Sequence, residues 1–326
     1  MIIDVHNHFY PAEYLDALGP LGSVIKVTYD KDGNPLVHYP GDYNVLVRGH
    51  RDIAYREEVM EAEGVDVQLI SLTTPGTHIE TPALAATLAT ITNDAFARIR
   101  DDRGARFVPL ATLPLCDARA SLSEYLRATD QLGLRGAMLF SNVNGVGLDD
   151  ERFWPLYEAA NDRDGLLMIH PTYPVGVEAM NEYWLMPLNG FLFDTTLAAS
   201  KLVFSGVAKR YPRIRWILGH LGGTIPYLAE RLDRGYRAFA ECRQHIDEPP
   251  TAYLKRNFYY DTVNFSQGPL KLAIEFAGAD RILAGSDYPH QIGSIPLMLE
   301  ALRALPITQA QREAILGGNA KRLLGI

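Results

Sequence analysis

The sequence predicts an α/β fold, and three observations favour a (β/α)8 TIM barrel within that class. Short apolar or β-branched runs alternate with longer stretches of helical periodicity along the whole chain. The predicted strands are almost continuously apolar, which is typical of a parallel sheet buried on both faces. There are eight of them, the number that closes a barrel. A doubly wound open sheet is the alternative, but no glycine-rich fingerprint follows the first predicted strand.

The predicted elements alternate in order. The eight strands are expected at residues 2–8, 65–72, 105–115, 136–143, 166–171, 214–220, 258–263 and 281–287. The clearest amphipathic helices between them are expected at residues 82–100, 120–133, 151–165 and 224–241.

One irregularity interrupts this alternation after the first predicted strand. The segment VIKVTYDKDGNPLVHYP contains two alternating runs joined by a turn at Asp32-Gly33-Asn34. This pattern predicts a small β-hairpin inserted in the first βα loop, at roughly residues 22–40. Loops at that face of a barrel build the active site, so the hairpin is expected to form either a lid or a surface ornament.

Length and composition restrict the class of protein. The chain has 326 residues, a formal net charge of −8 and 47% hydrophobic residues. One barrel or two ordinary domains would fit this length, and without an evident linker a single domain over residues 1–326 is expected. The acidic balance argues against nucleic-acid binding. No apolar run is long enough to span a membrane, and no secretory signal is recognisable, so a cytoplasmic protein is expected.

Cysteines and cofactor motifs add little. Cys116 and Cys242 lie far apart and form no CxxC, so neither a disulfide framework nor a thiolate zinc site is indicated. There is neither a dinucleotide fingerprint nor a phosphate loop, so no organic cofactor is expected.

Five polar residues stand at the carboxyl ends of predicted strands. His6 and His8 end the first strand, and their spacing directs both side chains to one face. His170, His220 and Asp287 end the fifth, sixth and eighth strands. In a barrel these ends converge, and imidazoles with a carboxylate suit one divalent metal ion, most naturally zinc, with manganese as the alternative.

The chain resembles the amidohydrolase superfamily, in the branch of aminocarboxymuconate-semialdehyde decarboxylase and related aromatic-acid decarboxylases. The resemblance rests on DVHNHFYP, MEAEGVDVQLIS, IHP, EYWLMPLNGFLFDTT, LGHLGG, GSDYPH and GNAKRLLGI, and covers essentially the whole chain. It implies that the metal is held by His6, His8, His170 and Asp287, with His220 as the catalytic acid and base. The fourth predicted strand lacks the lysine of dinuclear relatives, so the resemblance implies one ion.

The resemblance also suggests substrate-binding residues. Arg231, eleven positions after His220, matches a family arginine that reaches into a neighbouring subunit and binds a substrate carboxylate, which implies a homodimer or higher homo-oligomer. The alternative is a solvated arginine paired with Glu230 or Asp233. Further candidates are Arg48 or Arg51 in the first βα loop, Trp184 in the tryptophan motif, and His290.

We therefore expect a metal-dependent, non-oxidative decarboxylase of a conjugated or aromatic carboxylic acid, acting on a small acidic substrate. The alternative is a metal-dependent hydrolase or hydratase of a lactone or unsaturated dicarboxylate in aromatic-compound catabolism, since the same site serves both chemistries. A non-catalytic binding protein is less favoured, because the chain retains all five site residues.

Overall fold

The computed structural model describes residues 1–39 and 42–326. The chain divides into two compact units. The first comprises Met1–Met138 and Ser286–Pro296, and the second comprises Leu139–Gly285 and Leu297–Ile326. A single domain over residues 1–326 stays a prediction.

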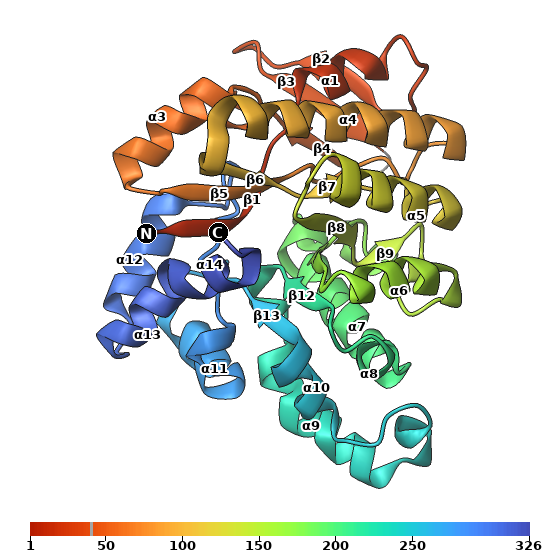
Figure 1. The fold of residues 1–326 in the computed structure, drawn as a ribbon, viewed down its shortest axis with the longest axis vertical. Coiled ribbons are helices and arrows are strands. Elements are labelled where there is room, and N and C mark those ends of the chain that lie inside the picture. Colours follow the sequence, from red (N-terminus) through yellow and green to blue (C-terminus); the bar gives the residue numbers. More distant parts are fainter. Residues whose placement is uncertain (40–41) are drawn as a thin grey trace. The chain divides into compact units, whose positions relative to one another are not determined.

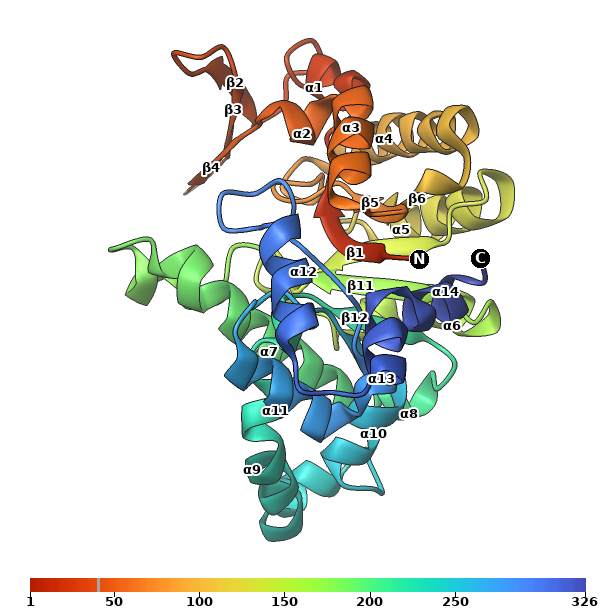
Figure 2. The same ribbon diagram turned by 90° about the vertical axis from the view of Figure 1, so that its left-hand side faces the viewer.

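The first unit is built on a buried parallel sheet. Its strands, in spatial order, are β1 (Ile3–His8), β5 (Val67–Ser71) and β6 (Phe107–Pro109). Every residue of these strands is buried, as their apolar sequences predict. Figures 1 and 2 show the long helix α4 (Pro82–Arg103) beside α1, and it packs against β6. The remaining helices of this unit are α1 (Ala12–Leu18), α2 (Arg48–Arg51), α3 (Ile53–Glu63) and α5 (Ala118–Leu126).

A small antiparallel sheet follows α1 in the chain. Its strands are β2 (Lys26–Tyr29), β3 (Pro35–Tyr39) and β4 (Asp42–Val45), in that spatial order. The turn between β2 and β3 is closed by Asp30, whose Oδ1 accepts hydrogen bonds from the amides of Asp32 and Asn34, both at 2.8 Å. Strand β4 was not predicted and extends the sheet beyond the expected hairpin. Residue 40, the end of that expected insertion, lies outside the described residues.

The predicted strand at residues 105–115 is two strands, β6 and β7 (Ala111–Thr112). Strand β6 pairs with β5, and the amide of Leu110 still donates to the carbonyl of Ile70. The next residues pair on the other side, so the chain changes its partner strand after Leu110. Strand β7 then pairs with β8 (Gly136–Phe140).

The predicted strand at residues 136–143 also differs. It splits into β8 and β9 (Asn142–Val143), and β9 turns back to pair antiparallel with β10 (Val146–Gly147). The turn is made by Asn144 and Gly145, both with positive φ. Asn-Gly is the preferred pair for such a turn, so the sequence itself carries the signal for it.

The second unit contains the parallel strands β11 (Leu166–His170), β12 (Arg215–Leu218) and β13 (Phe258–Tyr260). Within this unit they pair in the order β13-β12-β11. Trp216 is fully buried and stacks on Phe258 with ring centroids 6.1 Å apart. The helices after β8 are α6 (Trp154–Asp162), α7 (Phe191–Phe204), α8 (Val207–Arg210), α9 (Ile225–Ala238), α10 (Pro250–Asn257), α11 (Gln267–Ala277), α12 (Ile295–Ala304), α13 (Gln309–Glu313) and α14 (Asn319–Leu324).

The eighth predicted strand, at residues 281–287, is not a strand in the structure. Its contacts with other strands are limited to isolated parallel bridges, such as that between Tyr260 and Ile282. The amide of Ala284 donates instead to Ile315, and the amides of Ser286 and Asp287 both donate to the carbonyl of His6. Because these hydrogen bonds leave the regular ladder, the described residues form no closed eight-stranded barrel.

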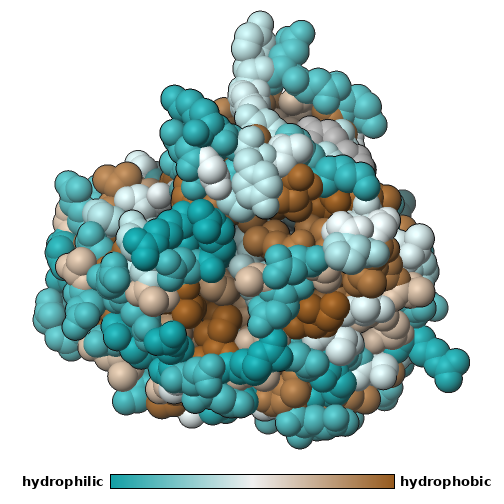
Figure 3. Space-filling model, turned by 90° about the horizontal axis from the view of Figure 1, so that it is seen from above, coloured by the Kyte–Doolittle hydropathy of each residue, from teal (hydrophilic) through white to brown (hydrophobic). Residues whose placement is uncertain are grey.

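The surface seen in Figure 3 is mostly hydrophilic, with smaller apolar areas between the polar ones. Among the described residues, no helix is both long enough and apolar enough to span a bilayer.

Candidate active site

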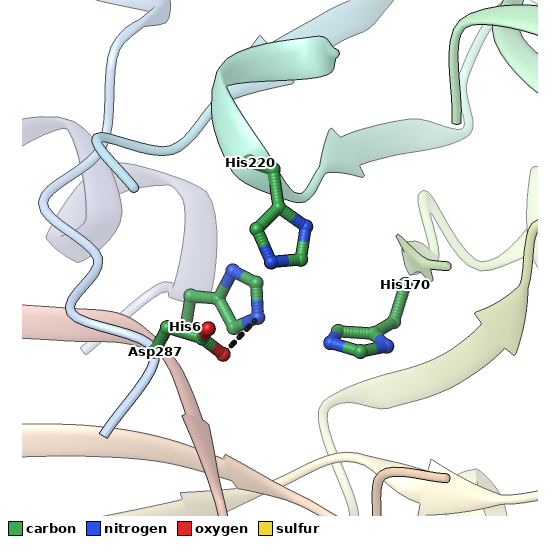
Figure 4. Close-up of side chains that lie close together, drawn as sticks. All are labelled: His6, His170, His220 and Asp287. Carbon is green, nitrogen blue, oxygen red and sulfur yellow. Dashed lines mark ion pairs between the residues drawn. The ribbon is translucent and has the colours of Figure 1, made fainter. Parts of the chain in front are cut away.

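Three predicted metal ligands of the first unit lie together at the end of β1. His6 and His8 are fully buried, and their Nε2 atoms lie 3.1 Å apart. Each of these nitrogens lies 3.3 Å from Oδ1 of Asp287, and Figure 4 draws the His6–Asp287 pair as a dashed line. The pleat of β1 explains why two histidines at this spacing share a face.

A buried aspartate positions Asp287 beside β1. Asp4 precedes His6 by two residues, and its carboxylate accepts hydrogen bonds from the amide and hydroxyl of Ser286 and from Gln68. Burial raises the pKa of Asp4 to about 6, and the hydrogen bonds from Ser286 oppose that rise. The amide of Asp287 donates to the carbonyl of His6 at 2.7 Å. The loop carrying Asp287 is therefore tied to the strand carrying His6 by side-chain and backbone bonds.

The buried side chain of Arg56, on α3, forms hydrogen bonds with residues at the end of β1. It is fully buried and donates to Oδ1 of Asn7, to the carbonyl of His8 and to the carbonyl of Gly49. Burial lowers the pKa of Arg56 to about 10, so the guanidinium remains charged at neutral pH. The guanidinium of Arg56 therefore links β1 to α2 by hydrogen bonds.

The donor set fits a divalent metal ion. With bonds of about 2.0–2.1 Å, two ligand atoms of a tetrahedral ion lie roughly 3.4 Å apart, and those of an octahedral ion somewhat closer. The three separations at His6, His8 and Asp287, 3.1, 3.3 and 3.3 Å, match this spacing. Burial holds the pKa of His8 well below its ordinary value, with Asp287 opposing the shift, and a neutral imidazole is the form that binds metals.

The second unit contains two of the histidines predicted at strand ends. His170 ends β11 and His220 follows β12, with ring centroids 5.5 Å apart (Figure 4). Nδ1 of His170 lies 2.7 Å from the carbonyl of Pro171. This hydrogen bond places the proton on Nδ1 and leaves the lone pair of Nε2 to bind an ion.

An unusual backbone turn carries His220. His220 and Leu221 both have positive φ, 54° and 57°. The buried carboxylate of Asp261 accepts a hydrogen bond from each of their amides, at 2.9 and 2.7 Å, and so holds the turn. Gly223 follows with φ of 63°, and a Cβ there would lie 2.2 Å from the carbonyl of Leu192. The motif LGHLGG therefore has a geometric reason for its last glycine.

The predicted substrate residues occupy different environments. Arg48 is exposed and pairs with Asp52 at 2.8 Å, and Arg51 is exposed and donates to the carbonyl of Leu46. His290 is half-buried, with its ring centroid 5.0 Å from that of His8. Of Arg48, Arg51 and His290, only His290 lies beside a predicted metal ligand of the first unit, namely His8.

Arg231 and Trp184 lie in the second unit. Arg231 is exposed on α9. The two carboxylates considered as its alternative partners have other contacts, because Glu230 pairs with Arg234 and Asp233 accepts from Thr251. Trp184 is 57% exposed.

Sequence reasoning missed Asp4, Arg56 and Asp261. Asp4 could have been found, because in DVHNH it shares the face of His6 and His8. Asp261 could have been recognised as a polar residue directly after a predicted strand core. Arg56 carries no such signal, because its burial depends on tertiary packing.

Comparison with known proteins identifies the family. The amidohydrolase family model matches residues 3–326. The chain is 30% identical over 276 residues to 2-amino-3-carboxymuconate-6-semialdehyde decarboxylase of Dictyostelium discoideum, covering 83% of this chain and 76% of that protein.

Solved structures agree with this relationship. The structure of 5-carboxyvanillate decarboxylase from Sphingomonas paucimobilis matches with a TM-score of 0.88 and 27% identity, over 100% of this chain and 99% of that one. A dihydroxybenzoic acid decarboxylase from Polaromonas, with bound manganese and the inhibitor 2-nitroresorcinol, matches with a TM-score of 0.84 and 28% identity, over 99% and 96%. The predicted resemblance is confirmed, and the chain belongs to the amidohydrolase family.

Proposed function

We propose that this protein is a metal-dependent, non-oxidative decarboxylase, a carboxy-lyase, that acts on a conjugated or aromatic carboxylic acid. The observation that carries the proposal is the convergence of His6, His8 and Asp287 at the end of β1. The relatives described above are named as decarboxylases of such acids, which favours this chemistry over a hydrolase or hydratase. Family membership also supports a complete (β/α)8 barrel with an inserted hairpin as the finer fold.

One divalent ion is proposed to be held by His6, His8, His170 and Asp287. The mutual spacing of His6, His8 and Asp287 supports this proposal. The orientation of the His170 ring supports it as well, because Nδ1 is held by a carbonyl and Nε2 is left to bind the ion. The manganese of the Polaromonas relative supports manganese, and the same donor set suits zinc. When bound, the ion supplies polarisation of a substrate oxygen, which draws electron density from the carbon that loses carbon dioxide.

His220 is proposed to deliver the proton that replaces the lost carboxylate. Imidazole has an ordinary pKa near 6.5, so it exchanges protons readily at neutral pH. Asp261 accepts a hydrogen bond from the backbone amide of His220 and so holds the turn that carries the ring.

Arg231 is proposed to bind an acidic group of the substrate in a neighbouring subunit. Its exposure on α9 supports this role, and large hydrophobic side chains are also exposed nearby in the sequence of this unit, including Phe193 and Tyr227. Such residues favour a homodimer or higher homo-oligomer. Arg48, Arg51 and Trp184 remain candidates for substrate contact. We also propose that the protein is located in the cytoplasm.

Product analysis tests the proposed reaction. Metal-loaded enzyme is incubated with a panel of aromatic and conjugated acids and with lactones, and the products are measured by mass spectrometry. Loss of carbon dioxide from any acid is the expected result. Gain of water without loss of carbon dioxide would instead establish a hydrolase or hydratase.

The role of Arg231 is tested separately by mixing subunits. Arg231→Ala and His220→Ala proteins are each expected to be impaired, and their mixture to recover about a quarter of wild-type activity, because one site in each mixed dimer is intact. A mixture as inactive as its components would contradict action across the interface.

A further inference from the structure

The side chain of His50 is the most unusual polar group of the first unit. It is 1% exposed, yet within the described residues neither of its ring nitrogens has a hydrogen-bond partner. Buried polar groups in folded proteins are almost always paired, so an unpaired buried imidazole indicates a group kept for a ligand. The stability of the fold does not explain it, because an apolar side chain of similar size would fill the same space without loss.

The position of His50 is fixed from two sides. The amide of Tyr10 donates to the carbonyl of His50 at 2.7 Å, and Arg56 donates to the carbonyl of the preceding Gly49 at 3.1 Å. Arg56 also binds the carbonyl of His8. The same buried guanidinium thus anchors both a predicted metal ligand and the short helix α2 that carries His50.

His290 connects His50 to the predicted metal ligands. Its ring centroid lies 5.0 Å from that of His8 and 5.0 Å from that of His50, so the three imidazoles form a row. The loop that carries His290 is compact, because its amide donates to the carbonyl of Asp287 and its carbonyl accepts from Gly293. A Cβ at Gly293 would lie 2.1 Å from the carbonyl of Asp287, so only glycine allows this closure.

We infer that His50, together with His290, recognises a hydroxyl group on the substrate ring and thereby selects hydroxylated aromatic acids. This inference rests on the proposed function. His50 is assigned as a specificity-determining residue at the end of the row that begins at His8, and it takes no part in breaking the carbon–carbon bond.

The chemistry of the ring favours a hydroxyl over a second carboxylate. Burial lowers the pKa of His50 well below its ordinary value, and the charges of His290 and Arg56 act in the same direction. A neutral imidazole offers one N–H donor and one lone pair. A hydroxyl both donates and accepts, so it can pair with whichever ring nitrogen faces the substrate, whereas a carboxylate only accepts and can pair with the N–H alone.

Binding of two small phenols tests the inference without turnover. 2-Nitroresorcinol and 2-nitrophenol differ by one hydroxyl, and their affinities for the metal-loaded protein are measured by calorimetry. We expect the wild type to prefer 2-nitroresorcinol by roughly tenfold, the usual contribution of one hydrogen bond. His50→Leu should lose this preference, and His50→Asn, which keeps a donor and an acceptor, should retain part of it.

A matched control separates recognition from folding. His38→Gln changes another histidine of the first unit, on β3, and should leave the preference intact. The unfolding temperature of His50→Leu should equal or exceed that of the wild type, because two unpaired buried atoms are removed. A purely structural role for His50 would instead lower it.

The outcomes distinguish this inference from the proposed function. A preference that persists in His50→Leu, or its absence from the wild type, overturns the role of His50 even if the enzyme releases carbon dioxide. Loss of the preference in His50→Leu supports the role even if no tested acid is decarboxylated.

Discussion

The two units hold their histidines by different means. In the first unit, His6 and His8 are packed side by side, and buried side chains of Asp4 and Arg56 fix the strand and loop around them. In the second unit, His220 is carried by a strained turn whose backbone amides are bound by Asp261. The first arrangement fixes ligand atoms at metal-binding distances, whereas the second fixes the direction of one ring. This difference is consistent with the proposed division between holding an ion and moving a proton.

The largest effect is expected at Asp287. Asp287→Ala removes a carboxylate oxygen from the spacing that suits an ion, and activity should fall on the order of 10³-fold or more, since a bound ion supplies several kcal/mol. Metal content, measured by mass spectrometry, should fall with it. Full metal content in this variant would contradict the assignment of the first unit as the main source of ligands.

His220 should behave differently. His220→Ala is expected to lower kcat by roughly 10²–10⁴-fold, the usual contribution of a general acid or base, while metal content stays at the wild-type level. His245→Ala, at an exposed histidine of the same unit, serves as the control. Loss of metal from His220→Ala would show that His220 is a ligand, and would contradict the proposed separation of ion-holding and proton-transferring residues.

A smaller effect is expected at Asp261. Asp261→Asn keeps one carbonyl oxygen but loses the second acceptor for the amides of the His220 turn, so kcat should fall roughly 10–100-fold with metal content unchanged. Asp280→Asn, at an exposed aspartate of the same unit, is the control and should have wild-type kinetics. A raised KM together with a lowered metal content would show that Asp261 supports the whole site and not the turn alone.

The smallest effect concerns stability. Added manganese or zinc should raise the unfolding free energy of the wild type by about 2.7 kcal/mol at a hundredfold excess over the dissociation constant. Thermal unfolding should show the same gain in His220→Ala and none in Asp287→Ala. A gain in all three proteins would indicate binding elsewhere.

Much of the site was predictable because strand period and strand ends are local properties. The spacing of His6 and His8 in DVHNH predicts a shared face, and the structure places both at the end of β1. The absence of a regular strand at residues 281–287 was not predictable, because the amides of Ser286 and Asp287 both donate to the carbonyl of His6, a residue far away in the sequence. The division of residues 105–115 into β6 and β7 was not predictable either, because it depends on which neighbouring strand each half pairs with.

The environments of the arginines and of His50 follow from tertiary packing alone. Arg48, His50 and Arg51 are neighbours in one short helix, yet only the histidine is buried. Periodicity assigns no inner face to a helix of four residues, so the sequence could not distinguish them.

Isotope tracing of the reaction tests the central claim most directly. The metal-loaded enzyme is given carboxyl-¹³C-labelled hydroxybenzoates in D₂O, and released gas and products are measured by mass spectrometry. Metal-dependent decarboxylation predicts labelled carbon dioxide and one deuterium at the carbon that carried the carboxylate, with both signals lost after chelation. A product that retains the label and gains the elements of water would contradict it.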